Sequence, residues 1–144
     1  MMRIKNHHLF FLIIFVIIYI ENKKGRKNMK IVYIADDGTQ FEDEDVCYAY
    51  ETVHKFPELH LIDFYDIDNN LYHISKTDPF NDDIYNRCEK IHVHNSTELS
   101  TLHWISTECG WCEFEDQITE PGIWVREAKN NIISDAEWRK ICND

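Results

Sequence analysis

The sequence predicts a small α+β domain beginning near Met29, with an antiparallel or mixed sheet and helices packed on one face. Three observations predict this class. Short runs with β-type alternation recur along the chain, segments with apolar residues at helical spacing separate them, and capping signals mark helix ends. With four Gly, three Pro and 13% aromatic residues in 144, the chain has the material for a packed core. The predicted order is β-α-β-β-(α)-β-α-β-α.

The first half of the domain is predicted to hold one helix and three strands. Lys30–Ala35 alternates apolar and β-branched residues, which predicts a strand. Asp43 is a candidate N-cap of a helix that Pro57 ends. The apolar residues of this helix recur at a spacing of three or four and are Val46, Cys47, Tyr50, Val53 and Phe56. Leu59–Tyr65 and Leu71–Ser75 then predict a hairpin around an Asp- and Asn-rich turn.

The second half is predicted from turn and capping residues. Gly110 is a candidate C-cap, and Ser134-Asp135-Ala136-Glu137 has the pattern of a capping box. The predicted elements are a weak helix at Pro79–Cys88, a strand at Lys90–His94, a helix from Asn95 or Ser96 to about Glu108, a strand at Ile123–Arg126 and a last helix to Cys142.

Residues 1–28 differ in character from the rest and are predicted to be a leader outside the fold. The apolar run Leu9–Ile20 has 12 residues, whereas a membrane-spanning helix needs about 17–25. No small-residue cleavage site follows it. A misplaced start, with translation beginning at Met29, is the favoured interpretation, and a signal anchor is the alternative. In the second case the basic residues after the run would keep the domain in the cytoplasm.

The charge of the chain is unevenly distributed. The formal net charge is −11, but residues 1–28 hold six of the 15 Lys and Arg and one of the 26 Asp and Glu. Residues 29–144 therefore carry nine basic and 25 acidic side chains, a net charge of −16. Such a domain repels nucleic acid and anionic membrane surfaces, so its expected macromolecular partner is a basic protein.

The acidic residues also cluster along the chain. Two clusters are predicted to bind a partner: Asp36, Asp37, Glu42, Asp43, Glu44 and Asp45 in the first, and Glu113, Glu115, Asp116 and Glu120 in the second. A surface of carboxylates could occupy a basic groove in place of nucleic-acid phosphates. The alternative is a solvated surface that only keeps the protein soluble.

Cys109-Gly110-Trp111-Cys112 is the most specific local motif. A zinc site normally needs four ligands, usually from two such pairs, and only one pair is present. His92 and His94, on one face of a strand, Cys88 or Cys142 would have to complete it. The alternatives are packed thiols, a metal site at Cys109 and Cys112, and redox chemistry. The adjacent Glu108 and Glu113 argue against the last. No cofactor is expected apart from zinc at this pair, and no catalytic motif is present.

The stretch YIADDGTQF (residues 33–41), followed by Glu44, Cys47 and Tyr50-Glu51, resembles a recurrent opening among small acidic proteins of phages and mobile elements. Some small acidic phage proteins inhibit host defence nucleases, including CRISPR effectors, by occupying their nucleic-acid sites. The resemblance implies a non-enzymatic inhibitor acting in the host cytoplasm by nucleic-acid mimicry, and it implies no catalytic residues. The alternatives are a structural or metal-binding adaptor using Cys109 and Cys112, and a small enzyme whose site is assembled only in three dimensions.

Overall fold

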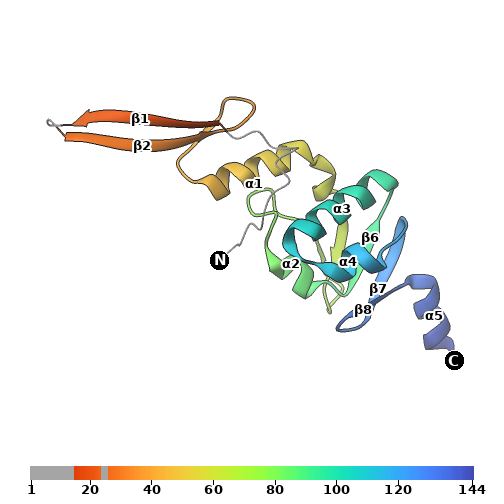
Figure 1. Ribbon diagram of the computed structural model, residues 1–144. Helices are drawn as coiled ribbons and strands as arrows, with labels where there is room; N and C mark the ends of the chain where they lie inside the picture. Colours follow the sequence, from red (N-terminus) through yellow and green to blue (C-terminus); the bar gives the residue numbers. More distant parts are fainter. Residues whose placement is uncertain (1–14, 24–25) are drawn as a thin grey trace. The chain divides into compact units, whose positions relative to one another are not determined.

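The computed structural model in Figure 1 describes residues 15–23 and 26–144, and these residues form two compact units. One unit ends at Lys55, and the other runs from Phe56 to Asp144. The described residues contain five α-helices and two antiparallel sheets, which confirms the α+β class. The strands are thus divided between two sheets, where the sequence predicted one.

The unit that ends at Lys55 contains a three-stranded sheet with the order β1-β2-β3. β1 (Phe15–Lys23) pairs with β2 (Arg26–Ile34), and β2 pairs with the short β3 (Gln40–Phe41). The strand predicted at Lys30–Ala35 corresponds to the second half of β2. The described part of the predicted leader forms β1 and the start of β2, and residues 1–14, where the apolar run begins, lie outside the described residues.

The helix of this unit, α1 (Glu44–Lys55), starts as predicted after Asp43, whose carboxylate accepts a hydrogen bond from the backbone N–H of Val46 at 3.1 Å. Its buried face differs from the predicted one. Val46 is exposed, whereas Tyr48 and Thr52 are buried together with the predicted Cys47. The buried Glu51 accepts a hydrogen bond from the backbone N–H of Asp36, which connects the helix to the turn after β2.

The unit from Phe56 to Asp144 contains a five-stranded antiparallel sheet with the order β5-β4-β6-β7-β8. Its strands are β4 (Asp63–Tyr65), β5 (Leu71–Tyr72), β6 (Lys90–Val93), β7 (Gly122–Ala128) and β8 (Asn131–Ser134). Its helical elements are the 3-10 helix η1 (Pro57–His60), α2 (Asp82–Arg87), α3 (Ser96–Cys109), α4 (Cys112–Gln117) and α5 (Asp135–Asn143).

The central strands of this sheet have one buried and one open face. Phe64 of β4 and Ile91 and Val93 of β6 are fully buried. The ring of Phe114, on α4, lies 6.1 Å from that of Phe64, so α4 packs on the buried face. Because side chains alternate along a strand, the neighbours of these residues in the chain point to the other face.

Several boundaries agree with the sequence. Gly110 ends α3 in the left-handed conformation, with φ of 74°, and Ser134 and Glu137 form the predicted capping box of α5. The predicted strand at Leu59–Tyr65 starts only at Asp63, because Leu59 is buried within η1. α4 and β8 were not predicted. No helix in the described part of the chain combines the length and apolarity needed to cross a membrane.

Arg126 of β7 holds the end of α2. Its Nε donates to the carbonyl of Cys88 at 2.8 Å and its Nη2 to the carbonyl of Tyr85 at 3.0 Å. The guanidinium also lies 4.8 Å from the centre of the Tyr85 ring. The fork of guanidinium donors therefore binds the carbonyl of the C-cap residue Cys88, and it adds a second donor to the carbonyl of Tyr85, which also accepts from the backbone N–H of Cys88.

Candidate functional site

The first acidic cluster forms an exposed surface on the unit that ends at Lys55. All six of its residues are exposed, in the turn after β2, beside β3 and at the start of α1. We call this the acidic surface, and it comprises Asp36, Asp37, Glu42, Asp43, Glu44 and Asp45. Six carboxylates in ten residues therefore face solvent from one unit.

Two of these carboxylates are held in place by local hydrogen bonds. Asp37 accepts from the backbone N–H of Thr39 at 2.9 Å and from the hydroxyl of Tyr50 at 2.5 Å. The Tyr50 hydrogen bond, followed by those from Thr39, lowers the pKa of Asp37 to about 2. Asp43 is the N-cap of α1. These two side chains have structural roles besides any role in binding.

The other members of the acidic surface have different surroundings. Glu42 forms an ion pair with Lys30 of β2, which lowers the pKa of Glu42. Glu44 and Asp45 lie in the first turn of α1, where the helix dipole favours negative charge. The charge of Asp36, Glu44 and Asp45 can be removed while the cap of Asp43 and the turn of Asp37 remain.

The second acidic cluster lies in the other unit, on α4 and the segment after it. Glu115, Asp116 and Glu120 are exposed. Glu113 is half-buried and accepts a hydrogen bond from the hydroxyl of Tyr85, which lowers the pKa of Glu113. Glu113 is therefore bound within the unit, and three carboxylates of this cluster remain exposed.

The two cysteines of the predicted metal pair flank Gly110 and Trp111 and have free thiols. Burial, followed by the charges of Asp82 and Glu108, raises the pKa of Cys109 to about 12, which disfavours the thiolate that binds metal or reacts. Cys112 is exposed. A zinc site at this pair stays a prediction.

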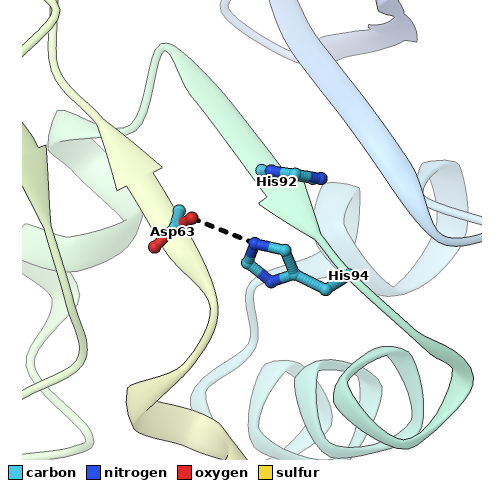
Figure 2. A group of neighbouring side chains, drawn as sticks. All are labelled: Asp63, His92 and His94. Atoms are coloured by element: carbon cyan, nitrogen blue, oxygen red, sulfur yellow. Dashed lines mark ion pairs between the residues drawn. The ribbon is translucent and has the colours of Figure 1, made fainter.

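The structure brings together a histidine–carboxylate cluster on the open face of the five-stranded sheet. Asp63 of β4 lies directly opposite His92 of β6 in the antiparallel ladder, and His94 follows two positions later on the same face. Figure 2 shows the three side chains converging from the two strands. In the part of the chain that the structure describes, they are the one group of three or more His, Cys, Asp or Glu side chains placed to share a metal ion.

The carboxylate of Asp63 is contacted on both oxygens. Its Oδ2 lies 3.1 Å from Nε2 of His94, and its Oδ1 accepts a hydrogen bond from Nε2 of His73 at 2.8 Å. His73 continues the β4–β5 register, in which Phe64 pairs with Tyr72. His73, Asp63 and His92 therefore occupy one row across three strands.

Glu98 of α3 holds His94 from the opposite side. One oxygen of the Glu98 carboxylate accepts from the backbone N–H of His94 at 2.7 Å and lies 2.9 Å from Nδ1 of its ring. Glu98 is only 2% exposed. The N-cap Asn95 places it in the first turn of the helix. A buried carboxylate thus fixes the orientation of the His94 ring.

No protein-family model matches this chain, and no curated protein and no solved structure matches it.

Part of the histidine–carboxylate cluster could be predicted from the sequence. His92 and His94 were predicted to lie on one face of a strand, but as additional ligands of a zinc site at Cys109 and Cys112. Asp63 and His73 were missed, although the predicted hairpin, closed symmetrically around its turn, pairs these two positions. Glu98 was missed because a glutamate three residues after an N-cap is ordinarily a helix-capping residue.

Proposed function

We propose that this protein is a non-enzymatic acidic binding protein that inhibits or modulates a basic nucleic-acid enzyme, such as a phage-encoded inhibitor of a host defence nuclease. In this proposal it acts in the host cytoplasm by occupying a basic groove in place of nucleic acid. The observation that carries the proposal is the acidic surface, because six exposed carboxylates lie within ten residues of a chain segment with a net charge of −16. The basic partner would be attracted by charge complementarity.

The local hydrogen bonds of the acidic surface support this proposal. Asp37 and Asp43 are held by Tyr50 and by the start of α1, so their carboxylates keep a fixed position before a partner arrives. Groups that are already ordered lose less conformational entropy on binding.

The test removes charge from the acidic surface without removing its structural contacts. The variant Asp36→Asn/Glu44→Gln/Asp45→Asn keeps both Asp37 and the Asp43 cap. A matched control, Asp68→Asn/Asp78→Asn/Asp83→Asn, removes the same charge from exposed residues elsewhere. Both variants should keep the far-UV circular dichroism spectrum of the wild type.

Each immobilised protein is used to capture partners from a host lysate, and captured nucleases are then challenged with duplex DNA. The wild type and the control should retain a nuclease that DNA displaces. The acidic-surface variant should associate with the nuclease at least about tenfold more slowly than the wild type, and this difference in association rate should shrink at high salt. Equal capture by the acidic-surface variant, or a captured nuclease that DNA does not displace, would contradict the proposal.

A further inference from the structure

We propose that Asp63, His92 and His94 bind one divalent transition-metal ion, with zinc as the representative ion. This inference goes beyond the proposed partner binding and involves other residues in the other unit. One ligand atom from each of the three side chains lies within 4.8 Å of the others, and the three come from paired strands of one sheet. A rigid sheet is a precise platform for such a site.

The distances fit a first-row metal after small side-chain movements. Zinc bonds to His nitrogen and carboxylate oxygen at about 2.0–2.2 Å, so two ligands of a tetrahedral ion lie about 3.3–3.6 Å apart. Asp63 Oδ2 and His94 Nε2 are already 3.1 Å apart. The rings of His92 and His94 have their centres 4.0 Å apart and the three ligand atoms lie within 4.8 Å of one another, so the His92 side chain must rotate to bring its nitrogen into the same shell.

The surroundings of the His94 ring supply the second argument. Both of its nitrogens face carboxylate oxygens, Nδ1 toward Glu98 at 2.9 Å and Nε2 toward Asp63 at 3.1 Å. A neutral imidazole has one N–H, so when Nδ1 donates to Glu98 the lone pair of Nε2 faces the Asp63 oxygen. A metal cation bound to both atoms removes their repulsion, as would a second proton on the ring, so metal and proton compete for this position. A buried carboxylate on the far nitrogen is also the usual second contact of a metal-bound histidine.

The remaining contacts indicate which ion the site would take. His73 donates to the other oxygen of Asp63, which orients the carboxylate and leaves Oδ2 for the metal. Two nitrogen ligands and one oxygen ligand suit zinc, iron, cobalt or nickel better than calcium or magnesium, which prefer oxygen. Three protein ligands leave a fourth position for water or another molecule, and His94 is partly exposed, so the site is accessible from solvent.

The test measures zinc binding to the full chain after chelator treatment, by isothermal titration calorimetry. Cobalt is used as a spectroscopic substitute for zinc. We expect saturation at one ion per chain and a cobalt spectrum of nitrogen and oxygen ligands. His92→Ala and His94→Ala should each weaken binding by at least a factor of about 100, and Glu98→Gln by about 10–100. His92 is half-exposed on the open face, so His92→Ala should stay folded.

Three control variants separate this site from others in the chain. His54→Ala, His7→Ala/His8→Ala and Cys109→Ser/Cys112→Ser should all keep wild-type binding. A sulfur-to-cobalt charge-transfer band, or loss of binding in the cysteine variant, would assign the metal to the cysteine pair and overturn the proposal. Undiminished binding by folded His92→Ala, or the absence of saturable binding by the wild type, would also overturn it. If the wild type shows no saturable binding, His94 is a histidine that contacts two carboxylates without binding a metal.

Discussion

Replacing Asn95 with alanine should destabilise the unit that carries the histidine–carboxylate cluster. Asn95 is exposed, has an extended backbone and accepts a hydrogen bond from the backbone N–H of Glu98 at 2.9 Å. Loss of an Asn N-cap costs about 0.5–2 kcal/mol. The orphaned N–H would belong to a residue that is 2% exposed, so water replaces the lost acceptor poorly. We therefore expect a loss in the upper half of that range, about 1.5 kcal/mol.

Urea denaturation followed by circular dichroism measures this loss as a lower midpoint with an unchanged m-value. Asn95→Ser is the matched control, because serine caps about as well as asparagine, and it should stay within a few tenths of a kcal/mol of the wild type. Asn95→Gly should fall between the two. A free energy of unfolding for Asn95→Ala equal to that of Asn95→Ser would refute the assigned role of the cap.

Two further predictions concern titration and thiol reactivity. Tyr50→Phe removes the main hydrogen bond that lowers the pKa of Asp37, so this pKa should rise from about 2 toward 3.8. In the wild type the ionised Asp37 contributes stability above pH 3.8 that is lost as the pH falls from 3.8 toward 2, and in Tyr50→Phe this contribution should be smaller. Carboxyl NMR titration that shows no rise in the pKa of Asp37 would contradict the contact. Burial raises the pKa of both Cys88 and Cys109 to about 12, whereas Cys112 is exposed. Iodoacetamide at pH 8 should therefore label Cys112 well before Cys88 or Cys109. Rapid labelling of Cys88, detected by peptide mapping, would contradict its buried position in the fold.

The sequence predicted the elements whose signals are local. The N-cap of α3, its Gly110 C-cap and the capping box of α5 were readable because hydrogen-bond donors and acceptors only a few residues apart form them. α4 was missed because it has six residues and no side-chain cap. Its stability comes from burying Phe114, which no local pattern reports. β8 is a four-residue strand whose pairing with β7 is likewise a tertiary contact.

The division into two sheets and the histidine–carboxylate cluster depend on strand pairing over long separations. Alternation places His92 and His94 on one face, but it does not say which strand lies beside them. The pairing of β4 with β6 brings Asp63 there, and α2 and the β4–β5 hairpin separate these strands in the chain. By contrast, the exposure of the acidic surface was expected, because charged turns and helix starts normally face solvent.

The hydrogen bonds from Arg126 to the end of α2 should slow hydrogen exchange in this helix. A helix of six residues would open freely if left alone, and its amides would exchange quickly. Since the side chain of Arg126 on β7 binds the carbonyls of Tyr85 and Cys88, separating the end of α2 from the sheet must also break those bonds. Slow exchange in α2 should therefore follow that of β7. In Arg126→Lys, whose single ammonium cannot reproduce the fork, α2 should exchange ahead of the strand.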